Sequence, residues 1–200
     1  MKEDTRKQTG EEKPGWKKTT VMYLHDLVYM LVTLMLVFLL LFRVIVVSGS
    51  SMYDTLIDGD YLLLLSNLFY REPEYGDIIV VSKESFDNGV PIIKRVIATE
   101  GQTVDIDFEA GIVYVDGTAL QEEYTYTPTN VREGMEFPLT VEENCVFAMG
   151  DNRNGSLDSR NPQIGHIDKR EILGKALFLF LPGVDEGRTG PDFERMGAIK

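Results

Sequence analysis

Near the start of the chain, apolar side chains form one long run without a polar face. Leu27–Phe42 is a stretch of 16 residues that carries no charge. Together with Val21–Leu24 and Val44–Val47 it supplies roughly 25 residues of apolar material, and a bilayer core requires about 20. Polar or charged residues interrupt only the ends, where lipid headgroups accommodate them: His25, Asp26 and Arg43. The pattern predicts a transmembrane helix over residues 21–45.

Two other structures give apolar runs near the start of a chain. A cleaved secretory signal has an apolar region of only about 7–15 residues, and this run is longer and ends in an arginine. A core helix of a soluble domain has a polar face, which is missing here. We therefore favour a retained membrane helix.

After this run, apolar residues occur in short β-rich segments that turn signals such as Asp58-Gly59 and Asn88-Gly89 separate. The predicted strands are Tyr61–Leu65, Asp77–Ser82, Pro91–Ala98, Thr103–Phe108, Ile112–Val115, Cys145–Met149 and Leu173–Leu181. We expect a mainly β domain over residues 46–182, in which the more polar residues 103–144 form a subdomain or an excursion from the main sheet. Residues 183–200 are Gly-rich and charged, and are predicted to be a flexible tail.

Charge is distributed unevenly on the two sides of the predicted helix. The net charge of −12 argues against non-specific binding of nucleic acid, because phosphates require a basic surface. Residues 1–20 carry six Lys/Arg against four acids, whereas residues 44–200 carry 13 against 27. The positive-inside tendency predicts a single-pass protein of the cell membrane, with residues 1–20 as a disordered cytoplasmic tail and the β domain outside the cytoplasm.

Cysteine and histidine are too few for several kinds of chemistry. Cys145 is the single cysteine, so an intrachain disulfide is excluded, and with only two histidines no metal-ligand cluster can be assembled. We expect no metal and no cofactor. Cys145 is predicted to be a core thiol, because no base lies near it in the sequence. His166 is interpreted as structural or exposed.

A short segment of small residues, Ser48–Ser51, follows the predicted helix. Gly and Ser permit a tight backbone that exposes a side chain and its amide, as a nucleophilic serine and its oxyanion site require. A flexible juxtamembrane linker has the same composition, so the segment alone leaves both interpretations open. Arg43 and Ser51 are at most about 27 Å apart in an extended chain, which places Ser51 near the outer membrane surface.

Lys94 lies inside an apolar run that predicts a buried strand. Alternation places Lys94 on one face with Ile92, Val96 and Ala98. Aliphatic surroundings desolvate an amine and lower its pKa. A lysine general base requires this, because an unperturbed amine, with a pKa near 10.4, is protonated at neutral pH. The alternative is a lysine at a strand edge that extends into water, and this segment alone does not decide between them.

Residues 150–160 form a polar loop rich in Gly, Asn and Asp, which follows a predicted strand. A calcium-binding loop does not fit, since Arg153 and Gly155 stand at positions that such a loop fills with acids. An ordinary surface loop is the other alternative. Acidic and basic residues alternate at spacings suited to internal ion pairs, and Ser156 is able to donate a hydrogen bond inward.

Taken together, these segments resemble the conserved boxes of bacterial type I signal peptidases. The matching residues are Gly49–Leu56, Gly76–Val80, Ile93–Ile97, Gly150–Arg153, Ser156, Asp158, Ser159, Arg160, Ile164–Ile167 and Leu173–Ala176. Each box alone is weak, but they occur in the family's order beside the expected anchor. Lys94 indicates the bacterial branch, because the eukaryotic and archaeal-like branch carries histidine at this position.

The resemblance implies a largely antiparallel β fold and a serine endopeptidase that removes signal peptides from exported preproteins. Ser51 is implied as the nucleophile, with its backbone amide donating to the oxyanion, and Lys94 as the general base. Ser156 is implied to hydrogen-bond and orient Lys94. The implied partners are signal peptides and the lipid bilayer, and we expect a monomer.

The resemblance also assigns supporting roles to other residues. Two ion pairs are implied to fix the polar loop: Asp151–Arg95 and Asp158–Arg160. Small apolar pockets for the residues before the cleavage point are implied to be lined by Val47, Met52, Leu56, Ile92 and Ile93.

Some positions depart from the family pattern, and other functions share part of it. Asp54 stands where proline is usual, and Gly49 replaces a serine that some relatives use as a second oxyanion donor. Whether Ser48 or Ser50 substitutes is left open. A self-cleaving repressor-type protease uses the same Ser–Lys chemistry but carries a DNA-binding N-terminal domain. A tethered β domain that binds a partner without catalysis is the other alternative.

Overall fold

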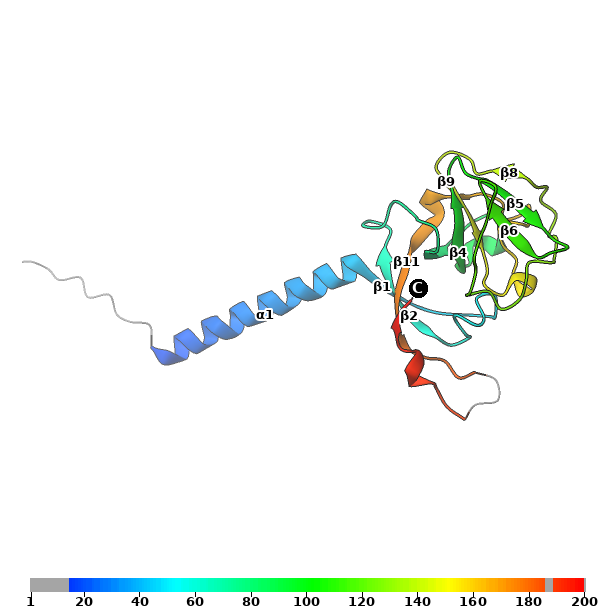
Figure 1. The fold of residues 1–200 in the computed structure, drawn as a ribbon. Helices are drawn as coiled ribbons and strands as arrows, with labels where there is room; N and C mark the ends of the chain where they lie inside the picture. The colour runs from blue at the N-terminus through cyan, green and yellow to red at the C-terminus, as the bar shows by residue number, and fades with distance from the viewer. Residues whose placement is uncertain (1–14, 186–188, 200) are drawn as a thin grey trace, which may run out of the picture. The chain divides into compact units, whose positions relative to one another are not determined.

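The computed structural model describes residues 15–185 and 189–199, in which a long helix precedes a β body (Figure 1). The helix and strands are α1 (Trp16–Leu41), β1 (Phe42–Val46), β2 (Tyr61–Ser66), β3 (Ile78–Val81), β4 (Ile92–Thr99), β5 (Thr103–Asp107), β6 (Ile112–Val115), β7 (Thr118–Ala119), β8 (Leu139–Thr140), β9 (Cys145–Met149), β10 (Ile167–Asp168), β11 (Ile172–Leu181) and β12 (Gly197–Ala198). The predicted mainly β domain is confirmed.

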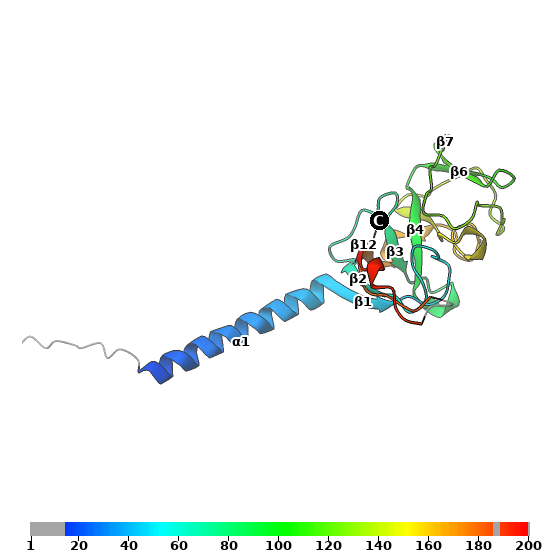
Figure 2. The same ribbon diagram turned by 60° about the horizontal axis from the view of Figure 1, so that its bottom comes forward.

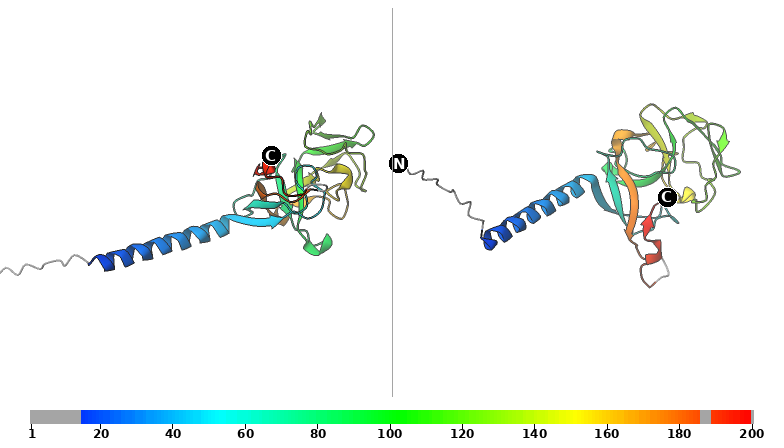
Figure 3. Two further views of the ribbon diagram at one scale, coloured as in Figure 1. Left: turned by 90° about the horizontal axis from the view of Figure 1, so that it is seen from below. Right: turned by 60° about the vertical axis from the view of Figure 1, so that its left-hand side comes forward.

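The larger sheet carries most of the body and is antiparallel throughout. Its strands follow the order β1-β2-β11-β3-β4-β9-β10, and β12 pairs with β11. The sheet curls, so that strands far apart in its order enclose a common interior (Figure 3). Two of the core clusters of buried apolar side chains lie along it, one centred on β2 and β3 and the other on β3, β9 and β10. This sheet brings β4, which lies between β3 and β9, toward the loop after β1.

Residues 103–140 build the second sheet, in the order β7-β6-β5-β8. It lies at the end of the body away from β1 and β2 (Figure 2). Its inward residues Val104 and Val113 share one buried cluster with Ile97 of β4 and Phe147 of β9. This segment is therefore an excursion that packs on the main sheet and shares its core.

The predicted transmembrane helix over residues 21–45 and the helix of the structure have different bounds. The helix begins at Trp16, within the predicted disordered tail, and ends at Leu41. Its residues Thr19–Leu41 are long and apolar enough to cross a membrane, with a mean hydropathy of 2.3. The following apolar residues form β1, which pairs with β2 from Phe42↔Leu65 to Val46↔Tyr61. Hydropathy does not separate helix from strand, and a run of β-branched residues with an available partner strand extends into the sheet.

Of the predicted C-terminal tail, residues 183–185 and 189–199 are described and contact the β body, whereas residues 1–14 of the predicted N-terminal tail lie outside the described part. The flexibility of the C-terminal tail stays a prediction. The Asp60 side chain is fully buried and contacts the C-terminal segment. It accepts hydrogen bonds from Arg195 Nη1 (2.9 Å) and Nη2 (2.8 Å) and from the Gly183 amide (2.8 Å). β12 then pairs with β11, and Ile199 packs against the apolar cluster centred on β2 and β3.

Replacing Arg195 by methionine is expected to lower the free energy of unfolding by about 3 kcal/mol, because the buried Asp60 loses its cationic partner. Chemical denaturation of the full chain in detergent measures this loss. Arg170→Met is the matched control: Arg170 also forms a double hydrogen bond with an aspartate, Asp168, but its side chain is 90% exposed. The control should change stability little. Equal losses in both variants would contradict the assignment.

Candidate active site

Ser51 lies on a closed loop between β1 and β2. The base of the loop is held by hydrogen bonds from the Val47 amide to the Asp60 carbonyl (2.8 Å) and from the Gly59 amide to the Val47 carbonyl (2.9 Å). Next to the base, Gly49 has a φ of 85°, a conformation that favours glycine. Its amide donates to Asp58 Oδ1 at 2.8 Å. The loop therefore has a defined conformation, which a flexible linker would lack.

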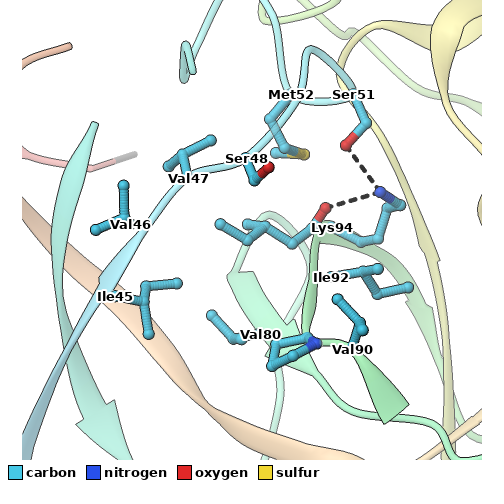
Figure 4. Close-up of a pocket in the computed structure, with 12 residues that line it drawn as sticks. Ile45, Val46, Val47, Ser48, Ser51, Met52, Val80, Val90, Ile92 and Lys94 are labelled. Carbon is cyan, nitrogen blue, oxygen red and sulfur yellow. Dashed lines mark hydrogen bonds between the residues drawn. The ribbon is translucent and has the colours of Figure 1, made fainter. Parts of the chain in front are cut away.

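Lys94 projects from β4, which is paired on both sides by β3 and β9. The residue is only 3% exposed. Its Nζ donates to Ser51 Oγ at 2.9 Å and to the Ile93 carbonyl at 3.0 Å (Figure 4). The strand-edge alternative does not hold, because the amine points into the body and meets the serine that the sequence proposed.

Burial lowers the pKa of the Lys94 amine to about 8, since desolvation disfavours its charged form. Three acids oppose this shift: Asp158, Glu133 and Asp151. Arg160 acts in the same direction as burial. With this pKa roughly a tenth of the amine is neutral at pH 7, and this neutral form is the one that abstracts the proton from Ser51.

Asp151 and Arg95 form a fully buried ion pair beneath the serine loop. Arg95 Nε and Nη2 donate to the two carboxylate oxygens of Asp151 at 2.8 and 2.7 Å. Thr55, on the serine loop, donates to the same carboxylate at 2.6 Å. The Asn152 amide donates to the Ser51 carbonyl at 3.0 Å. The polar loop is thereby tied both to β4 and to the loop that carries Ser51.

Asp158 and Arg160 form the second pair that the sequence analysis proposed. Arg160 Nε and Nη2 each donate to one carboxylate oxygen of Asp158 at 2.8 Å, and both side chains are fully buried. Asp158 also accepts from the Gly150 amide at 3.0 Å. A third pair, which the sequence analysis missed, joins Arg153 to Glu122. The Asp158–Arg160 pair joins two parts of the polar loop, and the Arg153–Glu122 pair ties the loop to the segment after β7, so it is not an ordinary surface loop.

Ser156 lies beside the Ser51–Lys94 pair, but the hydrogen bond proposed for it is not formed. Its hydroxyl is buried and has no hydrogen-bond partner among the described residues. It shares a hollow with Ser51 and Lys94. Its role in orienting Lys94 stays a prediction.

An apolar pocket of about 370 Å³ opens beside Ser51 and Lys94 (Figure 4). Four of the five proposed pocket residues line it: Val47, Met52, Ile92 and Ile93. Leu56, the fifth, packs in the core cluster with Met52 and does not line the pocket. The apolar wall is completed by five residues that the sequence did not indicate: Ile45, Val46, Val80, Val90 and Pro91.

Cys145 and His166 lie away from this site. Cys145 is buried in the core that the two sheets share, as predicted, and burial raises the pKa of its thiol. His166 faces Glu142, 3.5 Å from its carboxylate, at the edge of β10. In the described ranges, no group of three or more His, Cys, Asp or Glu side chains is placed to hold a metal ion.

Several residues that shape the site escaped the sequence analysis. Thr55 and Gly150 lay inside the quoted boxes, but nothing in their local sequence indicated a contact with Asp151 or Ser51. Glu122 and Glu133 lie in the polar excursion, where many acids look alike. Their partners, Arg153 and Arg160, belong to the loop after β9, and only the packing of the excursion against that loop identifies them.

A serine hydroxyl in contact with a buried lysine amine of lowered pKa, at the mouth of an apolar pocket, defines a candidate site of the Ser–Lys hydrolase class. The comparison with protein families gives the particular family. The chain belongs to the signal peptidases of peptidase family S26, whose family model matches residues 20–181.

Similar proteins carry the same description. A probable signal peptidase I-1 of Synechocystis sp. is 39% identical over 151 residues, covering 72% of this chain and 74% of that protein. Signal peptidase I T of Bacillus subtilis is 33% identical over 187 residues, covering 88% and 94%. A crystal structure of a signal peptidase I from Enterococcus faecalis is 30% identical and covers 52% of this chain and 96% of that chain, with a TM-score of 0.42.

Proposed function

We propose that this chain is a membrane-anchored serine endopeptidase that removes signal peptides from exported preproteins, with Ser51 as nucleophile and Lys94 as general base. The observation that carries the proposal is the 2.9 Å hydrogen bond between Lys94 Nζ and Ser51 Oγ, together with the lowered pKa of that amine. Membership of the signal peptidase family supports the choice of substrate.

The chemistry runs through an acyl-enzyme. Neutral Lys94 takes the proton of Ser51 Oγ as the oxygen attacks the carbonyl carbon of the scissile bond, and the Ser51 amide donates to the resulting oxyanion. The tetrahedral intermediate collapses when the C–N bond breaks, and Lys94 returns the proton to the leaving amine. Lys94 then takes a proton from a water molecule, which attacks the carbonyl carbon of the Ser51 ester. When the ester C–O bond breaks, Lys94 returns this proton to Ser51 Oγ, and the signal peptide leaves with a new carboxyl group.

The apolar pocket accounts for small side chains before the cleavage point. Its walls are short aliphatic residues and Met52, and it ends at the Ser51–Lys94 pair. When an extended peptide places a small apolar side chain in this pocket, the carbonyl of its scissile bond lies near Ser51. The reason is that successive residues of an extended chain advance by only about 3.3 Å.

The membrane arrangement is part of the proposal. Residues 19–41 cross the bilayer, the basic residues of 1–20 lie in the cytoplasm, and the β domain lies outside it. Charge supports this orientation, since the six basic residues of 1–20 precede the apolar span Thr19–Leu41 and acids predominate after it. The catalytic domain begins at β1, and the protein acts as a monomer.

Cleavage of a preprotein by the purified full chain tests the function. The product should begin at the residue after a small-x-small sequence, as mass spectrometry of its N-terminus shows. kcat/KM should rise about tenfold per pH unit below pH 8 and level off above it, because only neutral Lys94 accepts the proton. In sealed right-side-out vesicles an added peptide should be cleaved without detergent. A profile without a rise near pH 8, or activity seen only after lysis, contradicts the assignments.

A further inference from the structure

Two hollows meet at the Ser51–Lys94 pair. One is the apolar pocket described above, and the other is a hollow of about 430 Å³ on the side of the polar loop. Ser51, Ile92 and Lys94 line both. The remaining lining of the second hollow includes polar side chains, Glu133 and Ser156, as well as the apolar Leu157.

The reaction indicates what each hollow holds. Lys94 must return its proton to the leaving amine, so the leaving part of the substrate passes next to Lys94 Nζ. The apolar pocket takes the small side chains that precede the cut. The second hollow is then the place of the residues that follow it, the start of the mature protein. This step rests on the function proposed above.

A carboxylate stands in the wall of this second hollow. Glu133 belongs to the loop between β7 and β8, and its side chain is only 9% exposed. It lies 3.4 Å from Arg160, whose guanidinium already forms a double hydrogen bond with Asp158. In each of the other buried pairs near the site, one positive charge faces one negative charge: Asp151–Arg95 and Arg153–Glu122.

Glu133 is therefore the surplus negative charge of the site whenever Lys94 is neutral, which is the form that starts the reaction. Its surroundings are poorly solvated, and burial raises the pKa of its carboxyl group. A charge in such surroundings acts over a longer distance than one in water. Ser156 adds a buried hydroxyl without a hydrogen-bond partner among the described residues. A bound peptide that supplies a hydrogen-bond partner for this hydroxyl is therefore favoured.

We propose that this hollow is a specificity site for the residues directly after the cleavage point, and that Glu133 makes it favour a basic side chain over an acidic one. The recognised class is a mature protein that starts with neutral or positively charged residues. An acidic residue at the same place meets the carboxylate of Glu133 and is disfavoured by repulsion.

A matched set of peptides tests this inference with the full chain in detergent. Lys, Gln or Glu is placed in turn at the first and second positions after the cut, with the rest unchanged. For the wild type we expect kcat/KM about tenfold higher with Lys than with Glu at one of these positions. Glu133→Gln should reduce that ratio to about twofold or less. Glu136→Gln, an exposed acid on the same loop, is the control and should keep the wild-type ratio.

Ratios between substrates within one variant are compared, because Glu133 also raises the pKa of Lys94 and so affects all rates together. If the wild type cleaves the Gln peptides but is indifferent to charge, this inference fails while the proposed function stands. If the wild type cleaves none of the peptides, both the proposed function and this inference fail. A preference that survives in a folded Glu133→Gln variant also overturns the inference.

A second variant covers the case in which Glu133→Gln does not fold. Leu157 lines the same hollow and is 52% exposed, so a lysine there is tolerated by the fold. Leu157→Lys should remove or reverse the preference for the Lys peptide, because it places a positive charge in the hollow. An unchanged preference in this variant would show that the leaving residues do not pass there.

Discussion

Replacing Ser51 by alanine, or Lys94 by methionine, is expected to lower kcat/KM for preprotein cleavage by about four orders of magnitude or more. Ser51→Ala removes the atom that forms the acyl bond. Lys94→Met keeps the buried aliphatic length but removes the amine that contacts Ser51 Oγ at 2.9 Å. Because the two residues act as one unit, the double variant should be no slower than either single variant.

Folding and labelling distinguish lost chemistry from lost structure. Both variants should retain the wild-type circular dichroism spectrum and cooperative unfolding. Ser85→Ala, at an exposed position on the loop between β3 and β4, is the control that should keep full activity. An acylating probe should label Ser51 in the wild type and fail to label it in Lys94→Met. Full cleavage by either active-site variant would rule out the Ser–Lys mechanism. Labelling at another residue would assign the nucleophile to that residue instead of Ser51.

Gly150→Ala is expected to lower kcat by about two orders of magnitude while the β body stays folded. Gly150 lies at the point where the polar loop crosses the serine loop. A Cβ there would overlap Ser156 Oγ and the Ser51 carbonyl oxygen, so one of the two loops must move. A displacement of about 1 Å is enough to cost about 100-fold in rate. The overlap should also destabilise the fold by about 1–3 kcal/mol.

Gly197→Ala is the matched control for this prediction. Gly197 lies in β12, and a Cβ at that position has no neighbour within 4 Å. Steady-state kinetics and chemical denaturation of both variants measure the two effects. If Gly150→Ala keeps kcat within about threefold of the wild type, the contact between the loops does not position the reacting groups.

The strands and their faces follow from local pattern. All seven predicted strands are present, and their ends either coincide with the prediction or differ from it by one residue, because alternation and turn residues act within a few positions. The strands that escaped prediction are β1, which continues the apolar run of the helix, and four strands of two residues each, which are too short to show a period. Alternation along β4 does not correctly predict which core cluster each side chain joins. Ile92 and Val96 share one cluster, but the register shift between Val96 and Ala98 places Ala98 in another.

The sequence by itself determined the class of this protein: an apolar helix, a β domain, a serine in a tight segment and a lysine in a buried strand. The tertiary structure alone decided which of these residues meet. Lys94 contacts a serine 43 positions away, and Arg195 reaches Asp60 across 135 positions. Likewise, only packing excluded Leu56 from the pocket, left Ser156 without its proposed bond and placed Glu133 beside the site. The physical reason is that periodicity fixes which face a side chain takes, whereas its partner, its burial and hence its pKa depend on how distant segments close on one another.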